Sequence, residues 1–307
     1  MGIEVQSLRL LLLARELGCD FTRSLTIGQQ RLMFNRTQAQ QAFRERGLTA
    51  DEALLEAIGD QNACFAAPLM RKLGASSVDA LDISAFEGAS VIHDLNQALP
   101  PEHHARFSLV FDGGTLEHVF DVATAIKSLM SLPERNGHLI IAVPANNDMG
   151  HGFFQFSPEI FFRTLTPDNG YRIKLVAVAP LFTFRNWNLA RDPRTVGARV
   201  GYPGGSVPLY CFAIAQRTQV TDVFARTPQQ ADYAMEWEAF DATAEQKLLE
   251  AGPRGMRAFL HRVTPTPLAD LAREARMALR SGAPDTFAKF DPARQGAGAV
   301  QRYFAAN

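Results

Sequence analysis

Three aspartates each follow a short, apolar, β-prone stretch of the chain: Asp82, Asp94 and Asp112. If these stretches are parallel strands, their carboxyl ends meet at one edge of a sheet, where nucleoside ligands bind at the point at which the strand order reverses. A carboxylate at that edge can accept two hydrogen bonds from a pair of vicinal hydroxyls. Structural explanations stay open as well, because Asp82 can cap the next helix and Asp94 can form a turn.

His151 lies between Gly150 and Gly152, just after another predicted strand. A loop at this point can present the imidazole to a ligand, and the unperturbed pKa of imidazole suits proton transfer near neutral pH. His151 is therefore the candidate general base, although it could also simply tie the loop to backbone carbonyls. His118, at the start of a predicted helix, is more typical of a hydrogen-bonded structural histidine.

Neither the cysteines nor the other histidines predict a metal site. Cys19, Cys64 and Cys211 are odd in number, widely spaced and outside any CxxC or CxxH pattern, so they indicate neither a disulfide framework nor zinc. His103 and His104 are adjacent but lack a third ligand at useful spacing, which is typical of a solvated loop. We expect no bound metal, and the cysteine content fits a reducing cytoplasm.

The overall charge excludes some partners. The chain has 307 residues, with 31 Lys and Arg against 32 Asp and Glu. Without a basic excess there is little electrostatic drive toward nucleic acids or anionic membranes. The most apolar early stretch, residues 8–14, is far shorter than the ~20 residues of a membrane span. We therefore expect a small-molecule partner.

The elements that would position these residues alternate between strand and helix, which predicts a parallel sheet covered by helices. Residues 3–17 read as a leading helix, and residues 36–46 and 51–57 as two further helices. Apolar residues recur at helical spacing from Val119 to Met130, and Asn136-Gly137 is expected to end that helix. The predicted strands cover residues 24–27, 78–82, 90–94, 107–112 and 139–143.

The later part of the chain continues with strands at residues 174–179 and 209–215. Residues 185–208 between them contain four Gly and three Pro, which predicts a long insertion loop. Residues 229–280 return to a helical pattern, with one amphipathic helix carrying Leu268, Leu271, Ala275 and Leu279 on its apolar face. We expect an N-terminal helix (1–18), a central domain (19–218) and a helical C-terminal extension (219–307).

The segment after His151 contains many aromatic residues. Phe153, Phe154, Phe156, Phe161 and Phe162 could line an apolar pocket, but this spacing is also typical of core packing. The following Ser157-Pro158-Glu159 has the residue types of a helix start: a capping side chain, a first-turn proline and a carboxylate that suits the helix dipole.

Residues 78–147 resemble the class I S-adenosylmethionine-dependent methyltransferases, an α/β family with a Rossmann-like sheet. The likeness lies in the stretches VDALDIS, SVIHDLN, FSLVFDGGTLEHV and GHLIIAVP. HGFFQFSPEIFF is similar to a stretch found in a subset of these proteins, and the likeness extends over roughly residues 20–215. It implies S-adenosylmethionine as cofactor, held through the ribose by Asp82 with Ile83 and near the adenine amine by Asp94 with Leu95. It also implies a wall on the methionine side made by Asp112, Gly113 and Gly114.

One stretch departs from that family. Its first strand normally runs into a GxGxG loop, but here only Gly28 remains, followed by Gln29 and Gln30. The glutamine amides could replace the usual backbone contacts to the cofactor, with Gly28 and Gln29 in the site. Alternatively, the glutamine side chains fill the place of the cofactor.

Two functions follow from these alternatives. The first is methylation of an oxygen or nitrogen of a small molecule, such as a sugar or specialised metabolite, with His151 as base. The second is a catalytically inactive binding or scaffold protein of the same fold. In either case the C-terminal helices could contact a second copy of the chain or a partner enzyme. A nicotinamide oxidoreductase is disfavoured because the GxGxxG pattern is missing.

Overall fold

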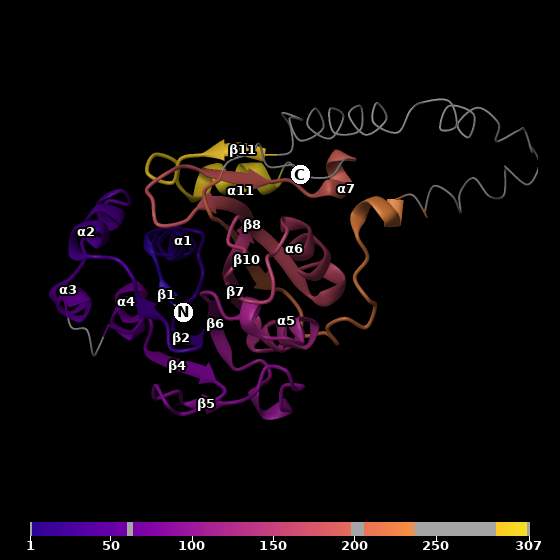
Figure 1. Cartoon of the computed structure of the whole chain (residues 1–307), viewed down its shortest axis with the longest axis horizontal. Helices are drawn as coiled ribbons and strands as arrows, with labels where there is room; N and C mark the ends of the chain where they lie inside the picture. Colours follow the sequence, from indigo (N-terminus) through magenta and orange to yellow (C-terminus); the bar gives the residue numbers. More distant parts are fainter. Residues whose placement is uncertain (1, 60–63, 198–205, 236, 238–286, 306–307) are drawn as a thin grey trace, which may run out of the picture.

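The structure is a computed structural model that describes residues 2–59, 64–197, 206–235, 237 and 287–305. Its centre is a nine-stranded sheet with the order β11-β9-β8-β10-β7-β6-β2-β4-β5 (Figure 1). A separate short parallel pairing joins β1 (Gly2–Ile3) to β3 (Arg31–Leu32).

One half of the sheet is parallel and confirms the five strands expected between residues 24 and 143. These are β2 (Arg23–Ile27), β4 (Ser77–Asp82), β5 (Val91–Ile92), β6 (Phe107–Asp112) and β7 (Pro133–Asn146). Numbered along the chain, they stand in the order 3-2-1-4-5, which is the order of Rossmann-like sheets. The fold is therefore the Rossmann-like, class I methyltransferase type that the sequence indicates.

The other half of the sheet is antiparallel. The predicted strands are confirmed as β8 (Tyr171–Pro180) and β10 (Leu209–Arg217), and β10 pairs with both β7 and β8. The prediction of a long loop over residues 185–208 is wrong for its first part. This part forms the strand β9 (Trp187–Ala190) and the one-turn helix α7 (Pro193–Val196). The reason is burial: the Trp187 indole is fully buried and packs at ring-centroid distances of 5.3 Å from Phe212 and 5.8 Å from Phe290.

The C-terminal extension contributes to this sheet. Its last part forms the edge strand β11 (Phe287–Phe290), which pairs with β9, and then the helix α11 (Ala297–Ala305). The extension is thus not purely helical, since Phe290 and Trp187 bury each other across the β9–β11 pair. The amphipathic helix predicted over residues 268–279 lies outside the described residues.

Helices cover the sheet on both faces (Figure 1). The first core contains residues of α1 (Val5–Glu16), α2 (Arg36–Arg44), α3 (Glu52–Gly59) and α4 (Ala67–Leu73), with Leu109 and Phe111 of β6. The second contains residues of α5 (Val122–Ser131) and α6 (Pro158–Thr164), with Val110 of the same strand. Neighbouring residues of β6 therefore face opposite cores, as in a strand that is buried on both sides. The predicted leading helix, α1, packs in the same core as the sheet.

The helix α5 begins at a cap and ends earlier than the sequence indicates. The Asp121 side chain accepts a hydrogen bond from the Thr124 N–H at 3.1 Å. The helix stops at Ser131, because Pro133 lacks the backbone N–H that would continue the helical hydrogen bonds. Asn136-Gly137 does not end the helix as expected. Both residues lie within β7, at an irregular stretch where Asn136 has a φ of +70°.

Three short 3-10 turns complete the described elements: η1 (Pro101–His103), η2 (Leu116–His118) and η3 (Pro167–Asn169). Within the described part of the chain, no helix is long and apolar enough to cross a membrane. The thiols of Cys19 and Cys211 are free and buried.

Candidate functional site

The carboxyl ends of β2 and β6 form the centre of the candidate site, because the strand order reverses between them. Ile27 at the end of β2 is level with Asp112 at the end of β6. Gly28 follows with a φ of +70°, which side-chain-bearing residues rarely adopt, and its N–H donates to the Leu81 carbonyl at 2.6 Å. The glycine that the sequence retains therefore forms the turn at the switch point.

Two of the predicted aspartates lie at the ends of neighbouring strands. Asp82 ends β4, is half-buried, and accepts a hydrogen bond from the Ile83 N–H at 2.7 Å. Asp94 follows β5 and accepts from the N–H and the side-chain amide of Asn96, at 2.9 and 2.8 Å. These bonds lower the pKa of Asp94 and give it the geometry of a turn former, the structural alternative for this residue. Ile83 is 66% exposed, whereas Leu95 is buried.

Gln29 and Gln30 lie in different environments. Gln29 is only partly buried, and its amide donates to the Gly88 carbonyl at 3.3 Å. Gln30 is fully buried, and its amide donates to the Ile27 carbonyl at 2.5 Å. A Cβ on Gly113 would lie 2.6 Å from Gln30 Oε1, so the glutamine packs directly against the start of the β6 turn. Gln30 is therefore the glutamine that points toward the switch point. The sequence instead predicts that Gln29, with Gly28, lies in the cofactor site.

Asp112 uses its carboxylate to fix the turn after β6. The side chain is fully buried and accepts from the Thr115 N–H at 2.8 Å and the Leu116 N–H at 3.4 Å. Burial raises its pKa to about 6, and the hydrogen bonds from the backbone oppose that rise. Asp112 thus stabilises the start of η2, which holds Glu117 and His118.

Glu117, in the turn η2 after β6, carries a buried carboxyl group. It has no exposed surface, and neither of its side-chain oxygens has a hydrogen-bond partner within the described chain. Burial, and secondarily the charge of Asp112, raises the pKa of Glu117 to about 8. An unpartnered carboxyl group this deep is uncommon in proteins, because burying it without donors is unfavourable.

Two histidines lie against this carboxylate. The Nε2 atoms of His151 and His118 are 3.4 Å and 3.9 Å from Glu117 Oε1, and the two ring centroids are 4.9 Å apart. Burial and then the neighbouring His151 lower the pKa of His118. His118 and His151 are thus brought together although they are far apart in the sequence. The sequence signals for this cluster are His151 between two glycines and the Glu117-His118 pair shortly after a buried strand.

The loop that carries His151 is fastened by backbone groups. The Phe153 N–H donates to the Glu117 carbonyl at 2.6 Å, and the His151 N–H donates to the Asp148 carbonyl at 3.0 Å. Gly152 has a φ of +74°, and a Cβ there would lie 2.7 Å from the Glu117 carbonyl oxygen. Only glycine therefore permits this close approach, and it fixes the position of His151 relative to Glu117.

The phenylalanines of this region divide between a core and an exposed rim. Phe156, Phe161 and Phe162 are buried in the second core, as expected for core packing. In contrast, Phe153 is 67% exposed and packs edge-on against Phe120, which is 75% exposed. An apolar surface thus lies beside the loop of His151. Ser157 caps α6 by accepting from the Glu159 N–H at 3.2 Å, as predicted.

Other polar groups lie outside this cluster. His103 is 3.2 Å from a guanidinium nitrogen of Arg106, and His104 is 3.1 Å from the Leu99 carbonyl, which agrees with a structural role. A cavity of about 840 Å³ lies beside α6, β8 and residues 225–229, and none of the predicted site residues lines it. Of the charged residues that line it, Arg163 pairs with Asp192 and also with Glu159 of α6.

No protein-family model matches the sequence, and no curated protein matches it either. Among solved structures, the chain is similar to the 1,6-didemethyltoxoflavin-N1-methyltransferase of Burkholderia thailandensis with bound 1,6-didemethyltoxoflavin and S-adenosylhomocysteine. That likeness has 15% identity and a TM-score of 0.35, over 70% of this chain and 78% of the other.

The chain is also similar to the N-methyltransferase NodS of Bradyrhizobium japonicum in complex with S-adenosylhomocysteine. This match has 13% identity and a TM-score of 0.32, over 69% of this chain and 86% of the other. A third similar structure is that of the YcgJ protein of Bacillus subtilis, with 11% identity and a TM-score of 0.37, over 70% of this chain and 99% of the other. Because these values are low, the assignment of the fold depends on the strand order described above.

Proposed function

We propose that the protein is an S-adenosylmethionine-dependent methyltransferase that acts on an oxygen or nitrogen of a small molecule. The observation that carries this proposal is the joint position of Gly28, Asp82 and the Glu117–His151 pair at the carboxyl edge of a Rossmann-like sheet. Ligands bind to such sheets at the switch point, and here a basic imidazole and a buried carboxyl group flank that point.

On the cofactor side, the available groups suit a nucleoside with a charged tail. Among the described residues, the half-buried Asp82 carboxylate accepts a hydrogen bond only from the Ile83 N–H, so it can take further hydrogen bonds from ribose hydroxyls. The exposed apolar surface of Ile83 lies beside it. Gln30 Oε1 is buried, has no hydrogen-bond partner among the residues that the structure describes, and would accept from a donor such as an ammonium group. The bound cofactor would supply an electrophilic methyl group on sulfur. Asp94, with the adjacent Leu95, and Gly114 remain predicted contacts of this ligand.

On the acceptor side, His151 takes the proton of the methyl acceptor. A proton on this imidazole creates a positive charge 3.4 Å from the Glu117 carboxyl group, which favours the ionised form of Glu117. The pair thereby stabilises the imidazolium, in the way that carboxylates support imidazole bases in other enzymes. The exposed rings of Phe120 and Phe153 offer an apolar surface for the body of a small organic acceptor.

Calorimetric titration of the purified chain with S-adenosylmethionine and S-adenosylhomocysteine tests the proposal. We expect saturable binding of both ligands, weakened by ~1–3 kcal/mol in Asp82→Ala through loss of a charged hydrogen bond. Asp222→Ala is the matched control, because this carboxylate is 77% exposed and pairs with Lys127 on the surface. Absence of binding to either ligand would overturn the methyltransferase proposal.

One observation favours the alternative function, a methyltransferase-like protein without catalysis. The buried Gln30 side chain fills space beside Gly113, where the family's loop has small residues. If Gln30 excludes the cofactor, Gln30→Gly creates binding that the wild type lacks, whereas Gln29→Gly does not. If Gln30 instead holds the cofactor, Gln30→Gly weakens the wild-type binding.

The remaining expectations concern surroundings rather than chemistry. A contact of the C-terminal helices with a second copy or a partner enzyme stays a prediction, as do the cytoplasmic location and the absence of nucleic-acid and membrane partners.

A further inference from the structure

Glu117, His118 and His151 present three metal-ligand atoms to one point. Each residue offers one such atom, and these atoms all lie within 4.8 Å of one another. Two ligands that each lie about 2.1 Å from an ion at a tetrahedral angle are about 3.4 Å apart. The distance from Glu117 Oε1 to His151 Nε2 is 3.4 Å, and that to His118 Nε2 is 3.9 Å. Small side-chain rotations are enough to bring all three atoms onto one ion.

The carboxylate in this cluster lacks the partners that a buried charge requires. Glu117 is fully buried, both of its oxygens are without hydrogen bonds within the described chain, and a second buried carboxylate, Asp112, adds negative charge nearby. Its ion-pair neighbours among the described residues are the two imidazoles, which carry charge only when protonated. A divalent cation would neutralise this carboxylate and coordinate both imidazoles in their neutral form.

The cluster is also accessible and held in place. The imidazoles of His118 and His151 are 43% and 44% exposed, so an ion would reach them from solvent and keep positions open to a ligand. The turn of η2 and the loop of His151 are joined by the bond from the Phe153 N–H to the Glu117 carbonyl. The ligands therefore come from two segments whose relative position is fixed before any ion binds.

We propose that Glu117, His118 and His151 bind one divalent first-row transition-metal ion, with coordination positions left open toward solvent. Two imidazoles and one carboxylate suit Zn²⁺, Co²⁺ or Mn²⁺ better than Mg²⁺ or Ca²⁺, which prefer all-oxygen sites. The inference concerns the acceptor side of the proposed function but does not depend on methyl transfer. If a hydroxyl group of the acceptor binds to the ion, the ion lowers the pKa of that hydroxyl. Activation by the ion would then replace proton removal by a free His151 imidazole.

The test uses the untagged full chain after treatment with a chelator and removal of that chelator. Titration with Zn²⁺ by calorimetry and with Co²⁺ by visible absorption is expected to show one ion per chain, with Mg²⁺ not competing. His118→Ala and Glu117→Gln are each expected to weaken Zn²⁺ binding by more than about tenfold. His103→Ala is the matched control and leaves binding unchanged. Circular dichroism checks that each variant is folded.

Two outcomes overturn the metal site: no saturable Zn²⁺ or Co²⁺ binding, or equal binding by wild type, His118→Ala and Glu117→Gln. Both are independent of the proposed function, because S-adenosylmethionine binding is measured separately on the metal-free chain. A chain that binds the cofactor but no ion retains His151 as the base. A chain that binds the ion but no cofactor retains the metal site and loses the methyltransferase proposal.

Discussion

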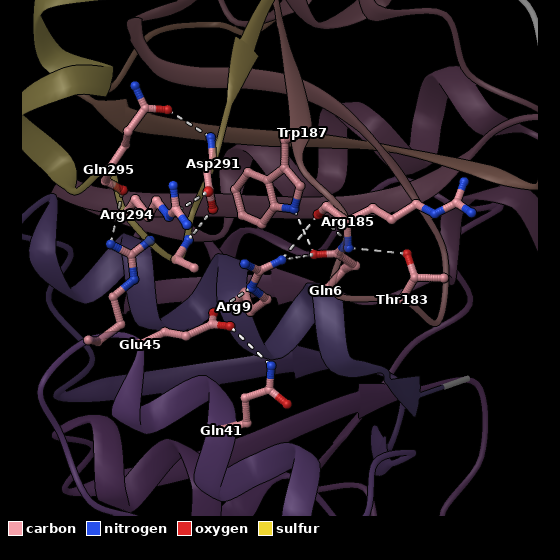
Figure 2. A network of polar contacts seen from close by, with 12 residues as sticks. Gln6, Arg9, Gln41, Glu45, Thr183, Arg185, Trp187, Asp291, Arg294 and Gln295 are labelled. Carbon is pink, nitrogen blue, oxygen red and sulfur yellow. Dashed lines mark hydrogen bonds and ion pairs between the residues drawn. The ribbon is translucent and has the colours of Figure 1, made fainter.

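The molecule buries charged side chains in two regions that differ in how those charges are matched. In the first region, Arg9 of α1 is 2% exposed, and its guanidinium donates to Glu45, to Gln6 Oε1 and to the Arg185 carbonyl at 2.9, 3.1 and 3.2 Å (Figure 2). In the second region, Glu117 is buried to the same degree, yet neither of its oxygens accepts a hydrogen bond within the described residues.

The difference separates a structural function from a chemical one. The Arg9 region joins segments that are distant in sequence: the Trp187 indole donates to Gln6 Oε1 at 2.7 Å, and Gln6 donates to the carbonyls of Pro180 and Arg185. Buried polar groups with complete partners stabilise one arrangement of the chain. In contrast, a buried carboxyl group beside two imidazoles, without a hydrogen-bond partner among the described residues, is typical of a functional site.

The largest expected effect is a loss of stability when the hydrogen-bond network around Arg9 is disrupted. Arg9→Met removes the cation that pairs with the Glu45 carboxylate, which is 14% exposed, and leaves Gln6 Oε1 with Trp187 as its remaining donor. The free energy of unfolding should therefore fall by ~3–5 kcal/mol. Urea denaturation measures the change. The control is Arg44→Met on the exposed face of α2, expected to stay within ~0.5 kcal/mol of wild type. A loss no larger than in that control would show that the network contributes little.

The second effect concerns rate and leaves stability alone. Once turnover is found, His151→Ala should lower it by roughly a hundredfold or more with nearly unchanged cofactor affinity, because a base acts in the transition state. The urea midpoint should not move, since the imidazole is 44% exposed. Equal turnover of the variant and wild type would return His151 to a structural role. His103→Ala controls for loss of a histidine elsewhere.

The third prediction tests whether a buried polar side chain without hydrogen-bond partners is by itself a sign of a functional site. His138 of β7 is 2% exposed, neither ring nitrogen has a hydrogen-bond partner in the described chain, and no other histidine adjoins it. Burial, and then Lys174, lowers its pKa to about 4. The unfolded state therefore binds a proton at a higher pH than the folded state, and stability falls as the pH drops from about 6.5 toward 4.

His138→Leu removes that proton-binding site. Between pH 7 and pH 4.5 the variant should lose roughly 2 kcal/mol less stability than wild type, as measured by urea denaturation at both values. Parallel losses in the two proteins would mean that His138 is readily protonated in the folded state. If the prediction is confirmed, a buried histidine that lacks hydrogen-bond partners and lies outside a cluster of possible metal ligands lowers stability in acid but does not form a functional site.

The smallest effect compares the buried Glu117 with the partly buried Glu45. In chelator-treated protein, Glu117→Gln should leave the free energy of unfolding unchanged or raise it by up to ~1 kcal/mol, because the carboxyl group it replaces has no hydrogen-bond partner in the described part of the chain. Glu45→Gln, which weakens the ion pair with Arg9, should instead lower it by ~1–3 kcal/mol. Chemical denaturation of both variants measures the two changes. If Glu117→Gln is the more destabilising, Glu117 belongs to the structural class.

Much of the site could be predicted from local sequence, because its positions follow from where strands end. Apolar runs closed by Asp82, Asp94 and Asp112 identified the parallel strands, and Gly28 marked the turn at the switch point. The prediction that Asn136-Gly137 ends a helix was wrong, because the same dipeptide is compatible with a helix end and with an irregularity in a strand. Only the pairing of β7 with β6 decides between the two.

The sequence by itself determined the parallel half of the sheet, since hydrophobic runs and turn residues act over a few neighbouring positions. Tertiary structure alone decided which of the two glutamines turns inward, because that depends on the space left between Ile27 and Gly113. It also decided that Glu117 meets His151, since a backbone bond between distant segments brings them together. Contacts of this kind depend on how the chain packs, which no local pattern of residues encodes.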